Sequence, residues 1–307
     1  MTIITHTVPF RGHQTWVRVT VPVDAKPDAL PLFVLHGGPG MAHDYVRNIE
    51  ELARTGRRVI HYDQLGCGRS THLPDAPAHF WSPELFVEEF HAVRQHLGIT
   101  RYHLLGQSWG GMLGAEIAVR CPAGLSSLAI CNSPASMALW MTAANELRAA
   151  LPQETQRALI RHEAAGTLTD PEYIAATAQF YLRHVCRVSP TPQDFLDSVA
   201  QMEAEPTVYH TMNGPNEFHV LGTLRSWSII ERLPRIEVPT LVIAGEFDEA
   251  TPATWRPYAD RIPGALSHVF PGASHCTHLE QPQQFQAFIA AFLARHDLAN
   301  SAGPAHA

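Results

Sequence analysis

The stretch His103-Leu104-Leu105-Gly106-Gln107-Ser108-Trp109-Gly110 contains the pattern G-x-S-x-G, which occurs once in the chain. An apolar run forms its first half, and the segment 109–120 that follows has the composition of a helix. Glycines flank a serine in this way where a strand passes into a helix through a turn too tight for side chains. Such a turn holds the hydroxyl of Ser108 clear of the sheet, beside the free N–H groups of the helix N-terminus. The stretch therefore predicts a nucleophilic serine on an α/β sheet.

Strands and helices alternate on both sides of this turn. Apolar runs occur at 31–35, 58–62, 103–106, 125–131, 240–244 and 267–270, and helical patterns at 44–54, 83–97, 109–120, 253–261 and 283–295. The runs lack alternating polar residues, which is typical of a mostly parallel sheet with helices on both faces. The first thirty residues alternate instead, as in 16–21, and predict further strands joined by turns.

A helical segment interrupts this rhythm between residues 135 and 233. Helical periodicity is present at 140–150, 154–165 and 172–184, and the sequence shows no clear buried strand there. We therefore divide the chain into a first core part (1–134), an inserted helical cap domain (135–233) and a second core part (234–307). The cap is expected to cover the C-terminal ends of the strands, where open α/β sheets bind ligands. The tail after Asn300 is expected to be disordered.

Composition and charge narrow the range of partners and compartments. The chain has 307 residues and a formal net charge of -7, which offers no basic surface for nucleic acid or anionic lipid. Its five cysteines lack a CxxC spacing, and no stretch approaches the roughly 18 apolar residues of a membrane helix. The N-terminus lacks the pattern of a secretory signal. We expect free thiols, a cytoplasmic location, and neither a nucleic-acid nor a membrane partner.

A serine hydroxyl needs a base to remove its proton, and the chain contains 19 histidines. Position selects among them, because in this kind of fold the base lies on the loop after the last strand. Pro271-Gly272-Ala273-Ser274-His275 is that loop, so His275 is the predicted base. His278 is the alternative, three residues later. A metal site made by these two histidines would lack a third ligand in the sequence.

The third member of the triad is expected to be an acid that follows the preceding strand. Gly245-Glu246-Phe247-Asp248-Glu249 comes directly after the apolar run 241–244 and supplies three carboxylates. Asp248, three residues past Gly245, is predicted to orient the imidazole of His275. For Glu246 a solvated loop charge is the simpler interpretation.

A glycine-rich loop, His36-Gly37-Gly38-Pro39-Gly40, follows the run 32–35. Gly and Pro alone would justify a bare turn here. In folds with this serine turn, however, the loop supplies the second N–H donor of the oxyanion hole. We predict that the N–H groups of Gly38 and Trp109 form that pair. Loss of one such donor typically slows the reaction about 100- to 1000-fold.

Together these motifs resemble the α/β hydrolases, and among them the proline iminopeptidases and the closely similar L-amino-acid amide hydrolases. The resemblance extends over nearly the whole chain, and it rests on His36–Gly40, Asp63–Ser70, Gly106–Gly111, Asp248 and the cap segment Met212–Phe218. The HGGPG and MNGPNEF sequences are far more specific than G-x-S-x-G. The chain departs from the family pattern at Trp109, whose large indole follows the nucleophile, and at Cys276, which follows His275.

The resemblance implies cleavage of an amide or peptide bond next to a free N-terminal amino acid, with proline the first acyl group to test. It implies that Glu217 in the cap and Glu249 beside Asp248 bind the substrate's ammonium group. A protonated amine in a closed pocket needs opposite charge to offset its lost hydration. The chemistry requires neither a metal nor an organic cofactor, and the expected partner is a small amide or peptide substrate.

Two other functions use the same residues. An esterase or lactonase would employ the same triad. A dehalogenase or epoxide hydrolase is disfavoured, because these enzymes usually carry Asp at the place of Ser108. A protein of a different class, a hydrolase homologue that binds a small ligand without turnover, would react poorly with a fluorophosphonate. The leaving group, the acyl side chain and the oligomeric state are left open by the sequence.

Overall fold

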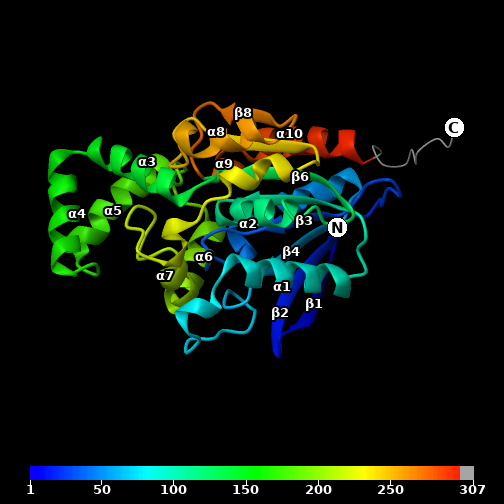
Figure 1. Cartoon of the computed structure of the whole chain (residues 1–307), viewed down its shortest axis with the longest axis horizontal. Coiled ribbons are helices and arrows are strands. Elements are labelled where there is room, and N and C mark those ends of the chain that lie inside the picture. The colour runs from blue at the N-terminus through cyan, green and yellow to red at the C-terminus, as the bar shows by residue number, and fades with distance from the viewer. Residues whose placement is uncertain (298–307) are drawn as a thin grey trace.

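A computed structural model describes residues 1–297, which contain one eight-stranded sheet in the order β1-β2-β4-β3-β5-β6-β7-β8 (Figure 1). The strands β1 and β2 join antiparallel at one edge, and the rest of the sheet from β4 to β8 is parallel. This arrangement confirms the predicted fold class. The strands are β1 (Thr2–Phe10), β2 (His13–Val21), β3 (Leu32–Leu35), β4 (Val59–Asp63), β5 (Tyr102–Gln107), β6 (Leu125–Cys131), β7 (Thr240–Gly245) and β8 (Leu266–Phe270).

Helices cover both faces of the sheet. The side chains of β3 show why its sequence is apolar throughout: Phe33 and Leu35 enter the core on one face, and Leu32 and Val34 enter the core on the other. Helices α1, α2 and α8 pack on the first face, and η1 and α10 pack on the second. Their bounds are η1 (His43–Thr55, a 3₁₀ helix), α1 (Pro83–His96), α2 (Trp109–Ala118), α8 (Pro252–Arg261), α9 (Thr277–Glu280) and α10 (Pro282–His296).

Between β6 and β7 the chain forms an inserted segment of helices, at the left in Figure 1. A hydrophobic cluster separate from those of the two sheet faces lies mainly in this segment and includes Leu159, Tyr173 and Phe180. Helix α6 was not predicted, although Phe195, Val199 and Met202 recur at helical spacing and pack against the core beside the buried Ser198. The elements are α3 (Met137–Ala149), α4 (Gln153–Ala165), α5 (Pro171–His184), α6 (Gln193–Ala204), α7 (Thr207–Met212), η3 (Thr223–Ser226) and η4 (Ile230–Arg235).

The inserted segment is joined to the sheet body by main-chain hydrogen bonds at the end of α5. The carbonyl oxygen of His184 accepts from the N–H groups of Glu249 (3.2 Å) and His275 (3.1 Å), and that of Val185 accepts from Cys276 (2.8 Å). These bonds place the end of α5 against the loops that follow β7 and β8. None of the helices within residues 1–297 is long and apolar enough to cross a membrane. The predicted disorder after Asn300 concerns residues outside the described range.

One buried carboxyl group, Glu89 on α1, connects three elements of the body. Its Oε1 accepts hydrogen bonds from the Thr15 hydroxyl on β2 and from the N–H of Leu65 (2.8 Å). Burial raises the pKa of Glu89 from an ordinary 4.5 to about 8. At neutral pH the folded protein therefore holds this group as a neutral acid.

The raised pKa predicts a pH-dependent stability. Between pH 4.5 and about 8 the unfolded chain has released the Glu89 proton while the folded chain keeps it, so this group lowers stability as pH rises. In Glu89→Gln the stability should fall less between pH 5.5 and 8 than in the wild type, as measured by urea unfolding. Glu88→Gln, at an exposed neighbouring position, is the matched control and should follow the wild type. Parallel curves for Glu89→Gln and the wild type would contradict the assignment.

Candidate active site

The turn between β5 and α2 brings Ser108 to the C-terminal edge of the sheet. Its φ of 57° and ψ of −125° lie in a region that L-residues rarely adopt. A Cβ at Gly106 would lie 1.9 Å from the carbonyl oxygen of Gly110, and a Cβ at Gly110 would lie 2.1 Å from that of Leu35. Both flanking positions therefore require glycine, as the G-x-S-x-G pattern predicts.

His275 and Asp248 meet on the loops that follow β8 and β7. The Nδ1 atom of His275 lies 2.8 Å from Oδ1 of Asp248, and both side chains are buried. Asp248 is held in place by the N–H of Ala250 (2.8 Å) on Oδ1 and by the Asn132 amide (2.6 Å) on Oδ2. Asn132 was not among the predicted site residues, although its position directly after β6 is the signal that could have indicated it.

The structure separates His275 from its alternative, His278. The Nε2 atom of His278 lies 2.9 Å from the carbonyl oxygen of Tyr45, and burial lowers the pKa of this histidine to about 4. The ring is therefore a neutral group bonded to backbone and is not directed at Asp248. Glu246 is exposed and accepts a hydrogen bond from the N–H of Gly272 (2.8 Å), in agreement with a loop charge.

The glycine-rich loop after β3 approaches the serine turn. The N–H of Gly37 donates to the hydroxyl of Tyr45 (2.6 Å), and Gly38 has a φ of 111°, which only glycine adopts without strain. Trp109 begins α2, so its N–H is one of the first four that have no partner within a helix. Gly38, Ser108 and Trp109 line one narrow cavity, whose remaining wall is mainly apolar: Pro39, Met112, Pro134, Met137, Trp140 and Leu224.

The two predicted amine-binding residues reach this site from different segments. Glu249 is buried, its Oε1 lies 3.7 Å from Nε2 of His275, and neither carboxylate oxygen has a hydrogen-bond partner within residues 1–297. Glu217 lines the cavity, and its Oε1 accepts from the hydroxyl of Tyr209 (2.7 Å). Burial raises the pKa of each glutamate, and the charges of Glu217 and Asp248 raise that of Glu249 further. Within residues 1–297 neither the buried Glu249 nor the half-buried Glu217 pairs with a Lys or Arg, so this pair of carboxylates would favour a positively charged ligand.

Trp140 on α3 contacts both Glu217 and the ring of His275. Its indole N–H donates to the carbonyl oxygen of Glu217 (2.7 Å), and its ring centroid lies 6.0 Å from that of His275. Trp140 and Tyr209 therefore hold the Glu217 main chain and side chain, respectively. Neither was predicted from the sequence, because each lies far from its partners along the chain and belongs to no motif.

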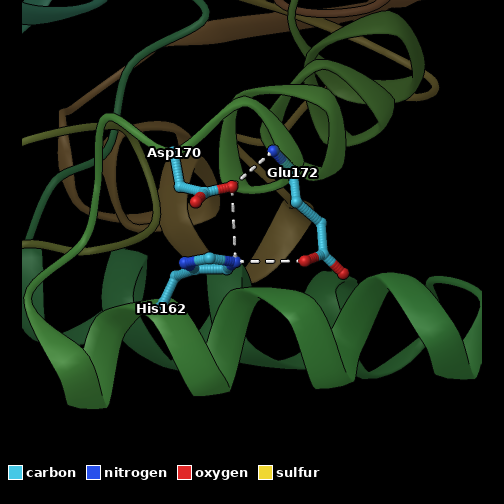
Figure 2. Close-up of side chains that lie close together, drawn as sticks. All are labelled: His162, Asp170 and Glu172. Carbon is cyan, nitrogen blue, oxygen red and sulfur yellow. Dashed lines mark hydrogen bonds and ion pairs between the residues drawn. The ribbon is translucent and has the colours of Figure 1, made fainter.

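A cluster of potential metal ligands lies on the inserted segment, in the α4–α5 hairpin, and it is the one found in the described part of the chain (Figure 2). His162 Nε2 lies 3.3 Å from Oε2 of Glu172 and 3.7 Å from Oδ1 of Asp170. The carboxylate of Glu172 also pairs with Arg161, and Oδ1 of Asp170 caps α5 by accepting from the N–H of Glu172 (2.9 Å). These contacts account for the cluster as ion pairs and a helix cap that join α4 to α5.

The mostly parallel sheet, the strained serine at its C-terminal edge and the His–Asp pair on the last two loops define an α/β hydrolase. The family profile described as alpha/beta hydrolase fold matches residues 31–282. The chain is 36% identical to the proline iminopeptidase of Lactobacillus helveticus over 302 residues, which are 97% of this chain and 100% of that protein.

Solved structures agree with this relationship. The crystal structure of a proline iminopeptidase from Mycobacterium smegmatis is 72% identical, with a TM-score of 0.92 over 96% of this chain and 99% of that one. The crystal structure of VinJ is 47% identical, with a TM-score of 0.93 over 95% of this chain and 99% of that one. The chain thus belongs to the proline iminopeptidase family of α/β hydrolases, as the sequence motifs predict, and it is a hydrolase.

Proposed function

We propose that this hydrolase removes the N-terminal residue, proline first, from a short peptide or an amino acid amide through an acyl-enzyme on Ser108. The observation that carries the proposal is the pair of enclosed carboxylates, Glu217 and Glu249, beside the His275–Asp248 pair. A plain esterase has no need of a buried and a half-buried carboxylate beside its triad, whereas an enzyme that binds a free amine does. The names of the similar proteins support the same substrate class.

In the proposed reaction His275 removes the proton of the Ser108 hydroxyl as the oxygen attacks the substrate carbonyl. Asp248 accepts from Nδ1 of His275, so it leaves Nε2 free to take the proton and stabilises the imidazolium. The N–H groups of Gly38 and Trp109 stabilise the oxyanion. His275 then protonates the leaving amine or ammonia, and water hydrolyses the acyl-enzyme by the reverse path.

The proposed acyl pocket is the apolar wall of the cavity. Pro39, Met112 and Met137 present apolar atoms beside Ser108, and Trp140 closes the side that faces His275. A compact apolar side chain such as the pyrrolidine ring of proline matches this lining. The segment 135–233 acts in this proposal as the cap, because it supplies Glu217, Met137 and Trp140.

Kinetics on matched substrates test the proposal. Prolyl, alanyl and leucyl aryl amides compare the acyl groups, and prolinamide against a Pro-X dipeptide compares the leaving groups. We expect prolyl substrates to have the highest kcat/KM. Higher kcat/KM for esters or lactones without an amino group would show that the protein is an esterase or lactonase on the same triad.

A further inference from the structure

The motif Asp63–Ser70 takes no part in the proposed reaction, although it lies directly after β4 at the same edge of the sheet. The Asp63 carboxylate closes the turn: Oδ1 accepts from the N–H of His43 (2.8 Å), and Oδ2 accepts from the N–H of Arg69 (2.9 Å). Ser70 joins the same turn to β2 by accepting from the N–H of Trp16 (2.8 Å). The residue after Asp63, Gln64, therefore stands on a well-supported turn.

Gln64 is buried and uses both ends of its side-chain amide. Its Oε1 accepts from the indole N–H of Trp109 (2.8 Å), and its Nε2 donates to the carbonyl oxygen of His36 (3.0 Å). Its main-chain N–H donates to Nε2 of His36 (3.0 Å). A single residue thus contacts Trp109 and the loop that carries Gly38, which are the two sources of the predicted oxyanion donors.

The two ring nitrogens of His36 connect Gln64 to the peptide unit before Gly38. Burial lowers the pKa of His36 to about 4, so the imidazole is neutral at neutral pH and has one donor and one acceptor nitrogen. Nε2 accepts from Gln64, and Nδ1 lies 3.0 Å from the carbonyl oxygen of Gly37, to which it donates. The chain of bonds from Gln64 therefore ends on the peptide unit that joins Gly37 to Gly38.

We propose that Gln64 is a positioning residue of the oxyanion hole, which sets the separation between the N–H groups of Gly38 and Trp109. The inference rests on the proposed function and gives Gln64, alone among the residues of this turn, a role in it. It also gives the Trp109 indole a role, because its N–H donates to Oε1 of Gln64. Oxyanion donors act over a narrow range of distances, about 2.7–3.1 Å.

Two variants test the role. Gln64→Met keeps the length of the side chain but removes both hydrogen bonds of its amide group. Trp109→Phe removes only the indole N–H. A misplacement near 1 Å costs about 100-fold in rate, so we expect kcat to fall about 10- to 100-fold in Gln64→Met and less in Trp109→Phe. KM should change little, because the oxyanion exists only after attack. The double variant should lose little more than Gln64→Met, since the two changes break a shared contact.

A fluorophosphonate separates this inference from the proposed function, because its reaction with Ser108 uses the oxyanion donors but not the amine site. We expect wild-type protein to be labelled rapidly and Gln64→Met slowly. Ser70→Ala, which loosens the same turn without contacting Trp109 or His36, is the matched control and should lose thermal stability but keep kcat.

The possible results separate the two ideas. Wild-type kcat and labelling rate in Gln64→Met would overturn the positioning role alone. A loss confined to KM, or one matched by Ser70→Ala, would overturn it as well, because a purely structural residue gives that result. If Gln64→Met fails to fold, an unchanged kcat in Trp109→Phe would overturn the positioning role. A wild-type protein that resists the fluorophosphonate would overturn the proposed function and this inference with it.

Discussion

Replacing Ser108 by alanine is expected to lower kcat/KM for a prolyl aryl amide by four to six orders of magnitude, roughly the loss seen when a triad serine is removed. His275→Ala should have a similar effect, and the double variant should be little worse, because the two side chains act as a unit. Steady-state kinetics and fluorophosphonate labelling of each variant measure this. Ser108→Ala should not be labelled at all.

The matched control for the histidine is His278→Gln. His278 lies in the short helix α9, three residues further along the chain, and is also buried, but its ring faces the carbonyl oxygen of Tyr45. The variant should keep most of the wild-type kcat. An inactive His278→Gln together with an active His275→Ala would show that the base has been assigned to the wrong residue.

The second large effect concerns the substrate's amino group. Glu217→Gln should lower kcat/KM for a free-amine substrate at least about 100-fold, because breaking a buried charge pair costs about 3–5 kcal/mol. A neutral ester of similar size should lose far less. An N-acetylated substrate should be poor for the wild type, since it leaves both carboxylates without a cation. Equal turnover of acetylated and free-amine substrates would contradict the assignment of Glu217 and Glu249.

The same pair predicts the shape of the pH profile. The pKa values of Glu217 and Glu249 are raised by burial, so both carboxylates become protonated, and binding of the ammonium group weakens, at a higher pH than for ordinary glutamates. The alkaline limb of kcat/KM should follow the substrate's own amine, near 7.7–8.0 for an ordinary α-amino group. In Glu217→Gln the acid limb should move to lower pH, because Glu249 loses the charge of its neighbour. An unmoved acid limb would show that the pair does not control binding.

The parts of the fold that were predictable depend on local sequence. The apolar run of β5, the glycines around Ser108 and the loop of His275 each contain their own signal within a few residues. Steric limits at Gly106 and Gly110 explain why the serine turn can be recognised without knowledge of the rest of the chain. The order of the βα units then places the C-terminal loops at one edge, and with them Asp248 and His275.

Other features were not predictable, because they depend on residues that are distant in the sequence. Trp140 and Tyr209 gain their roles only from contact with Glu217, and Gln64 gains its contacts from loops after β3 and β5. Helix α6 shows the same limit: it docks on η1 where the Ser198 hydroxyl accepts from the N–H of Tyr45 (3.0 Å), and Phe195, Val199 and Met202 pack beside that contact.

The main-chain hydrogen bonds at the end of α5 have a consequence for how substrate range can diverge in such proteins. His184 and Val185 are anchored through carbonyl oxygens, and every residue type possesses a carbonyl oxygen. Substitutions in α3, α4 and α5 can therefore accumulate, or whole helices be exchanged in a chimera, while the anchorage to the loops of Asp248 and His275 persists. Among these main-chain bonds, each would be abolished by proline at its donor position, 249, 275 or 276, since proline lacks the N–H. The pocket can therefore change in evolution while the catalytic centre stays the same.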